Sequence, residues 1–477
     1  MSAPPRLQWD GLYSETELYK TALRVYTKPL FSWRKALASS TDDATLYDFA
    51  RNGLNNLERL DRALKSRRFH FRPGVALQRT FGQKERTIYL FPWEDRIVDL
   101  LLYRLVNHAL HDWFSPHTYA YREGGLNLDR CQTKVGRALA SRSVSYVLKR
   151  DISNYFASID HELLRQKLAT FIDPGDYLFK LLMDRAACRY VEADGDKNAV
   201  PIAAARGVPF GTAAACLLAN IFLSDLDDAL AAVPGAACFR YADDILVVCP
   251  DAGTARAAAN AMDGALARLD LSSKASHHKN LVFSAAPVEA PGFEHASRLR
   301  HLGLEFRAGA PTALSRDKQR KIRNLFKFAL RRQAANIRQS SDPKKRALQA
   351  VGVVQRALEN GVRNVALIDY YLRHVEDEHQ LRLLDRWLAE EVLAVAFQNG
   401  HKKSSFGKLS FASLRVMGLP SLVHRARLLR HGHLKSPFFV WKSYKCRRAS
   451  HRTAARPRSR DVAVFSPGPA AATTVCS

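Results

Sequence analysis

The spacing of apolar residues predicts a helical beginning, followed by a region in which short strands and longer helices alternate. Apolar residues recur at helical spacing from Leu46 to Leu64, and a basic turn follows at residues 67–72. Segments rich in β-branched or aromatic residues predict strands at Thr87–Phe91, Tyr146–Leu148, Phe239–Tyr241, Ile245–Cys249 and Leu281–Ser284. Longer segments predict helices at Glu94–Trp113, Leu126–Ser141, His161–Thr170, Tyr177–Cys188, Thr212–Ala232 and Ala252–Leu269. This alternation predicts an α/β or α+β region.

The pattern becomes helical again after Ser315, through Leu325, Phe328, Leu348 and Leu358, and then from Val365 to Phe397. Beyond Arg447 the chain is rich in Ala, Ser, Pro and Arg, which predicts a disordered tail. The resulting domain prediction is an N-terminal helical segment at 1–68, a mixed region at 69–310, a helical region at 311–397 and a basic extension at 398–477.

Charge is distributed unevenly along the 477 residues, which contain 73 Lys and Arg against 46 Asp and Glu. The net charge of +27 includes only +5 from residues 1–315, but +10 from 316–346 and +15 from 398–477. With 47% hydrophobic residues the composition still supports a folded core. The sequence therefore predicts a polyanionic partner that is held mainly by the C-terminal third.

Several classes of protein are excluded by the same reading. The first residues lack the apolar segment of a secretory signal. The longest apolar stretch, Val208–Leu223, contains a proline, a glycine and an asparagine and is shorter than the roughly 18 to 20 residues of a membrane span. Seven cysteines without a CxxC pair predict unpaired thiols rather than a zinc ribbon or disulfide framework. We expect a cytoplasmic protein without a membrane segment.

Two aspartates stand out within the segment FRYADDILVVC at 239–249, which predicts a β-hairpin with Asp243 and Asp244 at its tip. An Asp-Asp pair alone is weak evidence, because Asp42-Asp43 and Asp227-Asp228 also occur and fit solvated acids at helix ends. Strands rich in Val, Ile and Leu flank Asp243 and Asp244, however, and burying acids there is costly without a counter-charge. A divalent cation would supply that charge.

A third aspartate, Asp151, follows the apolar segment that begins at Tyr146, and a capped helix begins near Asp160. Taken alone, Asp151 fits an aspartate at a strand end or a helix cap better than it fits a metal ligand. Phosphoryl transfer by two metal ions needs several carboxylates from separate strands around ions about 4 Å apart. Asp151, Asp243 and Asp244 together would meet that requirement.

These motifs resemble those of reverse transcriptases. YADD at 241–244 is similar to the family's YxDD signature, and RDISNYFASID at 150–160 is similar to its first carboxylate motif. In the family's order, residues 86–110 resemble the fingers, and YAYREG at 119–124 stands in place of YGFR. Residues 206–227 resemble the motif that cradles template and nucleotide. Lys279 resembles the lysine of the fourth palm motif, and HLGLEF at 301–306 resembles the primer grip. The resemblance covers roughly residues 70–310.

The resemblance implies an α+β right-hand polymerase fold, with fingers and palm at 69–310 and a helical thumb at 311–397, and the activity of an RNA-directed DNA polymerase. Asp151 and Asp243 would bind two Mg²⁺ ions, with Asp244 in support. Phe156 matches the aromatic gate that excludes a ribose 2′-hydroxyl, which implies a preference for deoxynucleotides. The remaining residues implied to bind the nucleotide are Lys84, Arg86, Phe210, Gly211 and Lys279.

The sequence departs from the family pattern at Phe210, where RGVPFG has phenylalanine in place of the usual glutamine. That glutamine helps to hold template and nucleotide in the family. The substitution therefore predicts either altered nucleotide selection or template geometry, or a simple change of packing.

Two basic segments are candidates for binding nucleic acid. Arg320, Arg323, Lys327 and Arg331 lie at helical spacing and fit a thumb face that grips a duplex, or else a solvated basic face. In the C-terminal extension, aromatic and basic residues alternate in a way that fits stacking on unpaired RNA bases, or else a solubilising tail or protein contact; they are Trp441, Lys442, Tyr444, Lys445, Arg447 and Arg448. His277 and His278 lack further spaced ligands and fit a structural role.

The biological role implied by the resemblance is that of the stand-alone bacterial reverse transcriptases of the unknown groups, many of which act in antiviral defence with a partner non-coding RNA. The expected partners are a structured RNA template, a DNA product and dNTPs. Intron-derived, retron-like and diversity-generating enzymes are the alternatives within the family. A catalytically inactive nucleic-acid-binding module and a two-metal nuclease are alternatives of another class. The sequence leaves the oligomeric state open.

Overall fold

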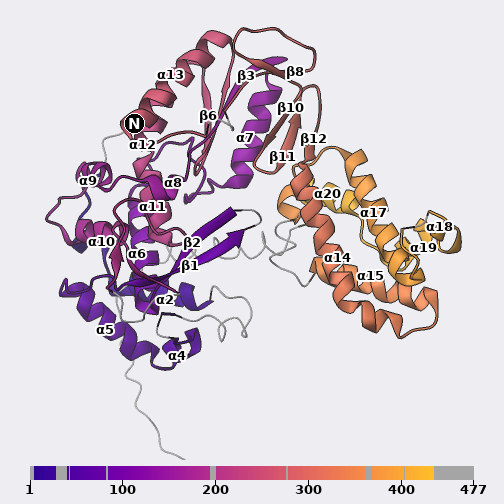
Figure 1. Cartoon of the computed structure of the whole chain (residues 1–477), viewed down its shortest axis with the longest axis horizontal. Coiled ribbons are helices and arrows are strands. Elements are labelled where there is room, and N and C mark those ends of the chain that lie inside the picture. Colours follow the sequence, from indigo (N-terminus) through magenta and orange to yellow (C-terminus); the bar gives the residue numbers. More distant parts are fainter. Residues whose placement is uncertain are drawn as a thin grey trace, which may run out of the picture. The chain divides into compact units, whose positions relative to one another are not determined.

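The computed structural model describes residues 5–27, 40–41, 43–81, 84–193, 200–274, 278–359, 368–401 and 403–434. The chain divides into two compact units, residues 1–315 and 316–477 (Figure 1). The second unit begins at Arg316, close to the predicted start of the thumb at residue 311. Among the described residues no helix has both the length and the apolarity needed to span a membrane.

The first unit combines helices with three sheets. Its helices are α1 (Trp9–Leu12), α2 (Glu15–Thr27), α4 (Leu46–Arg51), α5 (Gly53–Lys65), α6 (Trp93–Ala109), α7 (Leu128–Ala140), α8 (Tyr155–Ser158), α9 (His161–Ala169), α10 (Tyr177–Ala186), α11 (Ala213–Phe222), α12 (Ser224–Ala231) and α13 (Ala252–Arg268). Its strands are β1 (Gly74–Phe81), β2 (Lys84–Leu90), β3 (Val144–Asp151), β4 (Arg189–Glu192), β5 (Ile202–Ala203), β6 (Ala237–Tyr241), β7 (Asp244–Cys249), β8 (Lys279–Ser284), β9 (Glu294–Ala296), β10 (Arg298–His301), β11 (Leu304–Arg307) and β12 (Ala310–Leu314).

The central sheet has five strands in the order β6-β7-β3-β8-β9. Strands β6, β7, β3 and β8 pair antiparallel, and β9 adds parallel to β8. All five residues from Ile245 to Cys249 are buried, as expected for a strand covered on both faces. Helix α13 packs against β3 and β7, and α7 packs against β6. In this register Asp151 lies opposite Asp244 at one end of the sheet.

The other two sheets have the orders β2-β1-β4-β5 and β10-β11-β12. The N-terminal helices predicted as a separate segment at 1–68 share one hydrophobic cluster with the rest of this unit, to which Leu18, Leu60 and Leu64 contribute. Leu54, expected on the apolar face, is 69% exposed, because the helix is interrupted at Asn52 between α4 and α5. The single helix predicted at 212–232 likewise divides at Leu223 into α11 and α12.

The second unit is helical, as the apolar pattern predicts, and contains α14 (Arg316–Arg338), α15 (Pro343–Glu359), α17 (Glu378–Phe397), α18 (Ser405–Lys408), α19 (Phe411–Val416) and α20 (Leu422–Arg430). Helices α14, α15 and α17 pack against one another around buried residues such as Phe326, Leu330 and Leu388. Phe328 and Leu348 are instead 63% and 53% exposed. The predicted disordered tail lies outside the described residues.

An exposed charge cluster ties α17 to α20. Glu378 accepts hydrogen bonds from Arg427 at 2.5 and 2.7 Å, and from Arg382 and Arg430 at 3.3 Å. The hydrogen bonds from Arg427 are the main reason that the pKa of Glu378 falls from 4.5 to about 2. Because the folded state disfavours protonation of Glu378, this cluster stabilises the fold above about pH 4.5, and the contribution disappears as pH falls towards 2.

We therefore expect Glu378→Gln to lower the urea midpoint at pH 7 and to flatten the loss of stability between about pH 4.5 and pH 2. Urea unfolding of the full chain at a series of pH values, with hydrogen exchange of α17 and α20 as a local measurement, tests this. Glu192→Gln, at an exposed strand end in the other unit, is the control. Equal pH profiles for wild type and Glu378→Gln would contradict the prediction.

Candidate active site

The β6–β7 hairpin presents the Asp-Asp pair as the sequence predicts. Tyr241 pairs with Asp244, so Ala242 and Asp243 form a two-residue turn. Ala242 has φ 59°, a left-handed conformation that glycine usually adopts in such turns. The amide of Ile152 donates to the Asp243 carbonyl at 3.4 Å. The hairpin tip is thereby joined to the end of β3, and all three predicted aspartates lie at the same end of the central sheet.

At this end of the sheet, the neighbouring charges and burial shift the pKa of Asp243. Burial raises the pKa of Asp243, the Asp151 carboxylate raises it further, and Lys274 and Arg86 oppose both effects. Lys274 Nζ lies 2.8 Å from Asp151 Oδ2, and the Lys274 amide donates to the Asp151 carbonyl at 2.9 Å. A half-buried carboxylate beside a second one is stabilised by cations, which here are the two basic side chains.

Asp244 has different neighbours from the other two aspartates. Its Oδ1 lies 3.8 Å from Lys149 Nζ and 3.5 Å from His301 Nδ1. Burial, with a further contribution from Lys149, lowers the pKa of His301 to about 3, so this histidine is neutral near pH 7. In the part of the chain that the structure describes, no three His, Cys, Asp or Glu side chains gather to hold a metal ion. Asp151 and Asp243 are the two carboxylates that influence each other's charge, and the supporting role of Asp244 stays a prediction.

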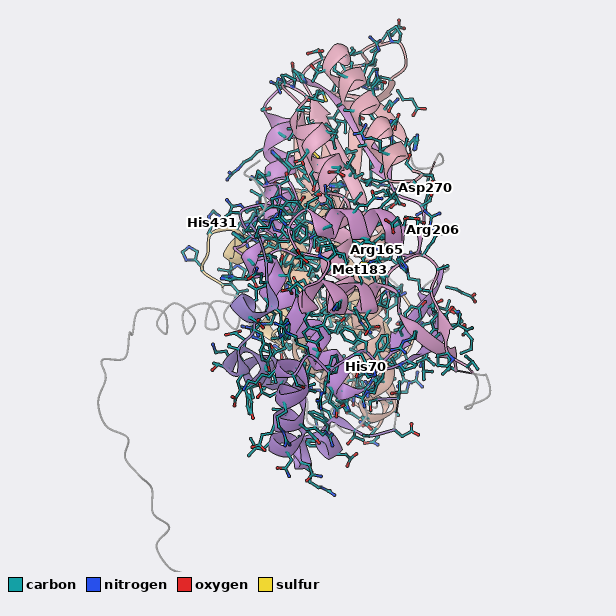
Figure 2. All side chains as sticks on the ribbon, turned by 90° about the vertical axis from the view of Figure 1, so that its left-hand side faces the viewer. His70, Arg165, Met183, Arg206, Asp270 and His431 are labelled. Atoms are coloured by element: carbon teal, nitrogen blue, oxygen red, sulfur yellow. The ribbon has the colours of Figure 1, made fainter. Side chains whose placement is uncertain are left out.

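A cavity of about 560 Å³ opens beside Asp243. It brings together four sequence-predicted residues, Arg86, Phe156, Phe210 and Asp243, and adds Lys274. The other residues that line it are Glu85, Thr87, Tyr89, Asn154, Tyr155, Ala157, Cys188, Ala204, Arg206, Gly207, Val208 and Pro209. Arg206 is held at the rim by a 2.6 Å ion pair with Asp270 (Figure 2). Burial raises the pKa of the Cys188 thiol to about 11.

The other predicted nucleotide-binding residues are not among those that line the cavity. Gly211 has φ 99° and borders the segment that lines the cavity. The side chain of Lys84 and all of His277 lie outside the described residues. Lys279 begins β8 opposite Lys149 and does not line the cavity. Lys274, which the sequence did not single out, lines the cavity, and its backbone amide donates to the Asp151 carbonyl at the end of β3.

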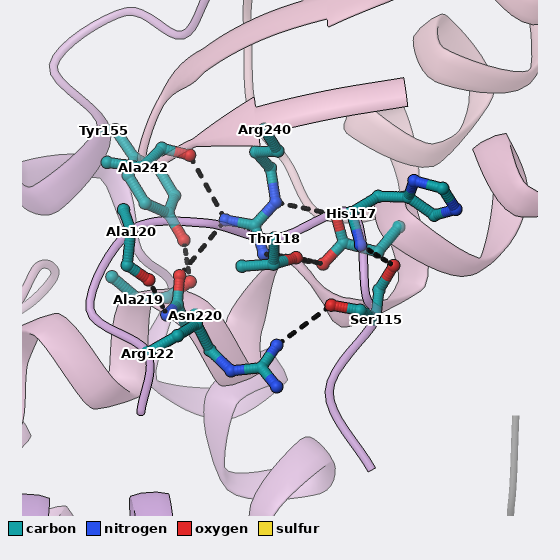
Figure 3. Close-up of polar contacts among 11 residues, drawn as sticks. Ser115, His117, Thr118, Ala120, Arg122, Tyr155, Ala219, Asn220, Arg240 and Ala242 are labelled. Atoms are coloured by element: carbon teal, nitrogen blue, oxygen red, sulfur yellow. Dashed lines mark hydrogen bonds and ion pairs between the residues drawn. The ribbon is translucent and has the colours of Figure 1, made fainter. Parts of the chain in front are cut away.

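Behind the hairpin lies a buried polar network that sequence reasoning missed (Figure 3). Arg240 Nη2 and Nε bind the Asp227 carboxylate at 2.6 and 2.7 Å. The same guanidinium donates to Thr118 Oγ1 at 3.1 Å, Asn220 Oδ1 at 3.2 Å and the Ala242 carbonyl at 3.2 Å. Asp227 is therefore a buried partner and not the solvated helix-end acid expected from the sequence. An arginine inside an apolar strand was the available signal, because such a charge requires a partner.

The basic residues predicted on α14 do not share one environment. Lys327 Nζ forms a 3.1 Å ion pair with Glu391, and the Arg323 guanidinium lies over the Trp387 ring at 5.4 Å. Two of the four residues therefore contact α17. Arg320 is exposed and pairs with Asp317 at 3.1 Å, and Arg331 is exposed. The six predicted residues of the C-terminal extension, Trp441 to Arg448, lie outside the described residues.

Comparison with known proteins bears on this site. Residues 81–306 match the family described as reverse transcriptase (RNA-dependent DNA polymerase). No curated protein matches the sequence. Among solved structures, the chain is similar to apo telomerase from Candida tropicalis truncated from the C-terminal domain, at 11% identity and TM-score 0.40 over 58% of this chain and 63% of that one. It is also similar to telomerase from Candida albicans in complex with a TWJ fragment of telomeric RNA, at 11% identity and TM-score 0.41 over 81% and 69%.

The matched segment contains the central sheet from β3 to β9, the three aspartates and the whole lining of the cavity. The α+β polymerase fold predicted from the sequence is confirmed, as is the enzyme class of the matched segment. Reverse transcriptase domains use divalent metal ions, for which carboxylate oxygens are suitable ligands. The match over residues 81–306 gives the enzyme class of this segment as that of an RNA-directed DNA polymerase.

Proposed function

We propose that this protein copies an RNA template by adding dNTPs to a primer 3′-hydroxyl, with two Mg²⁺ ions held at Asp151 and Asp243. The observation that supports it most directly is the cavity in which the half-buried Asp243 carboxylate, the Arg86 guanidinium and the Phe156 ring line one space. A carboxylate, a cation and an aromatic ring are the groups needed for metal, triphosphate and sugar respectively.

The donor set fits the proposed metal. Mg²⁺ is usually bound by one or two carboxylates together with waters and substrate phosphates, so Asp151 and Asp243 suffice without Asp244. When bound, the ions would activate the 3′-hydroxyl and neutralise charge that develops on the phosphates. Lys274, now at Asp151, is placed to move to a phosphate oxygen when a metal ion replaces it as counter-charge.

Two other side chains act on the nucleotide in this proposal. Arg86 is exposed at the cavity and would bind the triphosphate, where a planar guanidinium can contact two oxygens at once. Phe156 would exclude a 2′-hydroxyl by occupying the space beside the sugar. The protein is therefore expected to prefer dNTPs to rNTPs.

For the biological role, we propose a dedicated, structured non-coding RNA as template and a function in bacterial antiviral defence in the cytoplasm. The +15 charge of residues 398–477 supports an RNA partner, because neutralising phosphates releases counterions. Sequencing the RNA and DNA that copurify with the protein tests this role. One enriched RNA with complementary DNA would support it, and random cellular RNA without such DNA would count against it.

The proposed chemistry is tested by primer extension with an RNA template, a DNA primer, Mg²⁺ and labelled dNTPs. We expect templated extension that stops when EDTA is added and that is weaker with rNTPs. Binding of the primer–template without extension would favour the inactive nucleic-acid-binding module, and shortening of the primer would favour a nuclease. Extension that continues in the Asp243→Asn variant would contradict the proposed site.

A further inference from the structure

The substituted residue Phe210 makes two specific contacts at the cavity. Its ring meets that of Phe156 edge-on, with ring centroids 5.3 Å apart and an angle of 83° between the ring planes. The Arg86 guanidinium lies over the Phe210 ring, with Cζ 4.8 Å from the ring centroid. Edge-to-face aromatic pairs and cation–π contacts are both attractive at these separations. One side chain therefore touches both the sugar-side ring and the phosphate-side cation.

Backbone hydrogen bonds hold the segment before Phe210 against the segment that contains Phe156. The Val208 amide donates to the Phe156 carbonyl at 2.7 Å, and the Gly207 amide donates to the Ile159 carbonyl at 2.7 Å. Gly207 has φ 88°, and a Cβ on it would lie 2.8 Å from the Cα of Ala157. This close approach requires glycine and holds the segment before Phe210 directly against α8. The contact between Phe156 and Phe210 is thus set by the main chain as well as by the rings.

Phenylalanine changes what this position can offer to a ligand. A glutamine amide can donate and accept hydrogen bonds, whereas the Phe210 ring can only pack, stack and attract a cation. Arg86 is exposed and has a long flexible stem, so its contact with the ring limits the positions that the guanidinium samples. Phe156 is similarly limited, because moving its ring would break the edge-on contact.

We propose that Phe210 is a specificity-determining residue, which braces the Phe156 ring against the sugar and holds Arg86 ready for the triphosphate. This inference rests on the proposed function, because it takes the cavity as the dNTP site. Exclusion of the 2′-hydroxyl and grip on the phosphates then depend on the same side chain, and a change at Phe210 affects both.

The test is single-nucleotide primer extension by the full-length protein with dCTP and with CTP, comparing Phe210→Leu with Phe210→Tyr. Leucine keeps an apolar side chain but removes the ring, so we expect the ratio of kcat/KM for dCTP over CTP to fall about tenfold and KM for dCTP to rise about threefold. Tyrosine keeps the ring and is expected to retain both values within about twofold.

Two further variants separate bracing from general packing. In a Phe156→Leu background, Phe210→Leu is expected to reduce the ratio by less than about twofold, because the ring it would brace is gone. Phe293→Leu is the matched control, since Phe293 makes a similar edge-on pair with Tyr146, at 5.1 Å and 85°, outside the cavity. It is expected to leave the ratio unchanged.

An unchanged ratio in Phe210→Leu, or an equal loss in the leucine and tyrosine variants, would overturn the inference and leave the proposed function intact. If wild type adds no nucleotide, the proposed function fails, and the ratio of the Kd values for dCTP and CTP then tests the inference on the same five variants, the Phe156→Leu background included. Thermal unfolding of each variant confirms that it is folded before either ratio is interpreted.

Discussion

Replacing Asp243 by asparagine is expected to lower the rate of nucleotide addition by about 10³-fold or more. The carboxylate is one of two that would hold the metal ions, and charge stabilisation by such ions contributes several kcal/mol, with each 1.36 kcal/mol equal to a factor of ten. Asp151→Asn is expected to have an effect of the same size. Single-turnover primer extension at saturating Mg²⁺ and dNTP measures both.

The same substitution should leave the fold intact. Burial raises the pKa of Asp243, so the folded protein disfavours the charged carboxylate, and a neutral amide of the same shape removes that cost. We therefore expect a thermal midpoint equal to or above that of wild type, together with the loss of activity. Asp43→Asn is the control, because Asp43 is exposed at φ 58°, a conformation that asparagine also tolerates. A variant that loses both stability and activity would point to a structural role for Asp243.

The second large effect is expected at the buried pair of Arg240 and Asp227. Asp227→Leu leaves the Arg240 charge buried without its partner, which costs about 3–5 kcal/mol in the free energy of unfolding. The double variant Asp227→Leu with Arg240→Met removes both charges and should recover most of that loss. Urea unfolding of the full-length protein measures the two values. Lys20→Ala, which breaks an exposed pair with Glu17, is expected to change the free energy by less than about 1 kcal/mol.

Activity in the double variant shows what else Arg240 does. Its guanidinium donates to the carbonyl of Ala242, the strained residue that precedes Asp243 in the turn. Losing a charged donor there costs about 1.5–3 kcal/mol, so kcat is expected to fall about tenfold or more although stability is recovered, with KM for dNTP little changed. Full recovery of both stability and kcat would restrict Arg240 to a purely structural role.

The elements that carry the aspartates were predictable because they are apolar enough to be recognised. Strand β7 is a run of Ile, Leu, Val and Cys that is buried from Ile245 to Cys249, and β3 and β8 each contain a short apolar stretch, at 146–148 and 281–283. The hairpin and the strand end at Asp151 follow from those runs. By contrast, β1 contains the polar run Gln78-Arg79-Thr80, and in β10 Leu299 lies between two arginines. Strands of such mixed polarity have no strong local signal.

The candidate site was predictable only in part, for a related reason. The resemblance to reverse transcriptases implied that Asp151, Asp243 and Phe156 lie together, but it gave no position for Lys274, which reaches Asp151 from an irregular segment after α13. The contact of Arg240 with Asp227 joins a strand to a helix, and that of Phe210 with Phe156 joins a loop to a helix. Such contacts arise from tertiary packing, which the pattern of one sequence does not specify.

Cys188, at the edge of the nucleotide cavity, has a consequence for chemical probing. With a thiol pKa of about 11, only roughly one molecule in 10⁴ carries the thiolate at pH 7. Alkylating reagents and oxidants should therefore react slowly with Cys188 while its side chain stays buried in the cavity wall. Any conformational opening that hydrates this wall would speed the reaction. The rate of Cys188 alkylation, followed by mass spectrometry, therefore measures how often this part of the cavity wall opens to solvent.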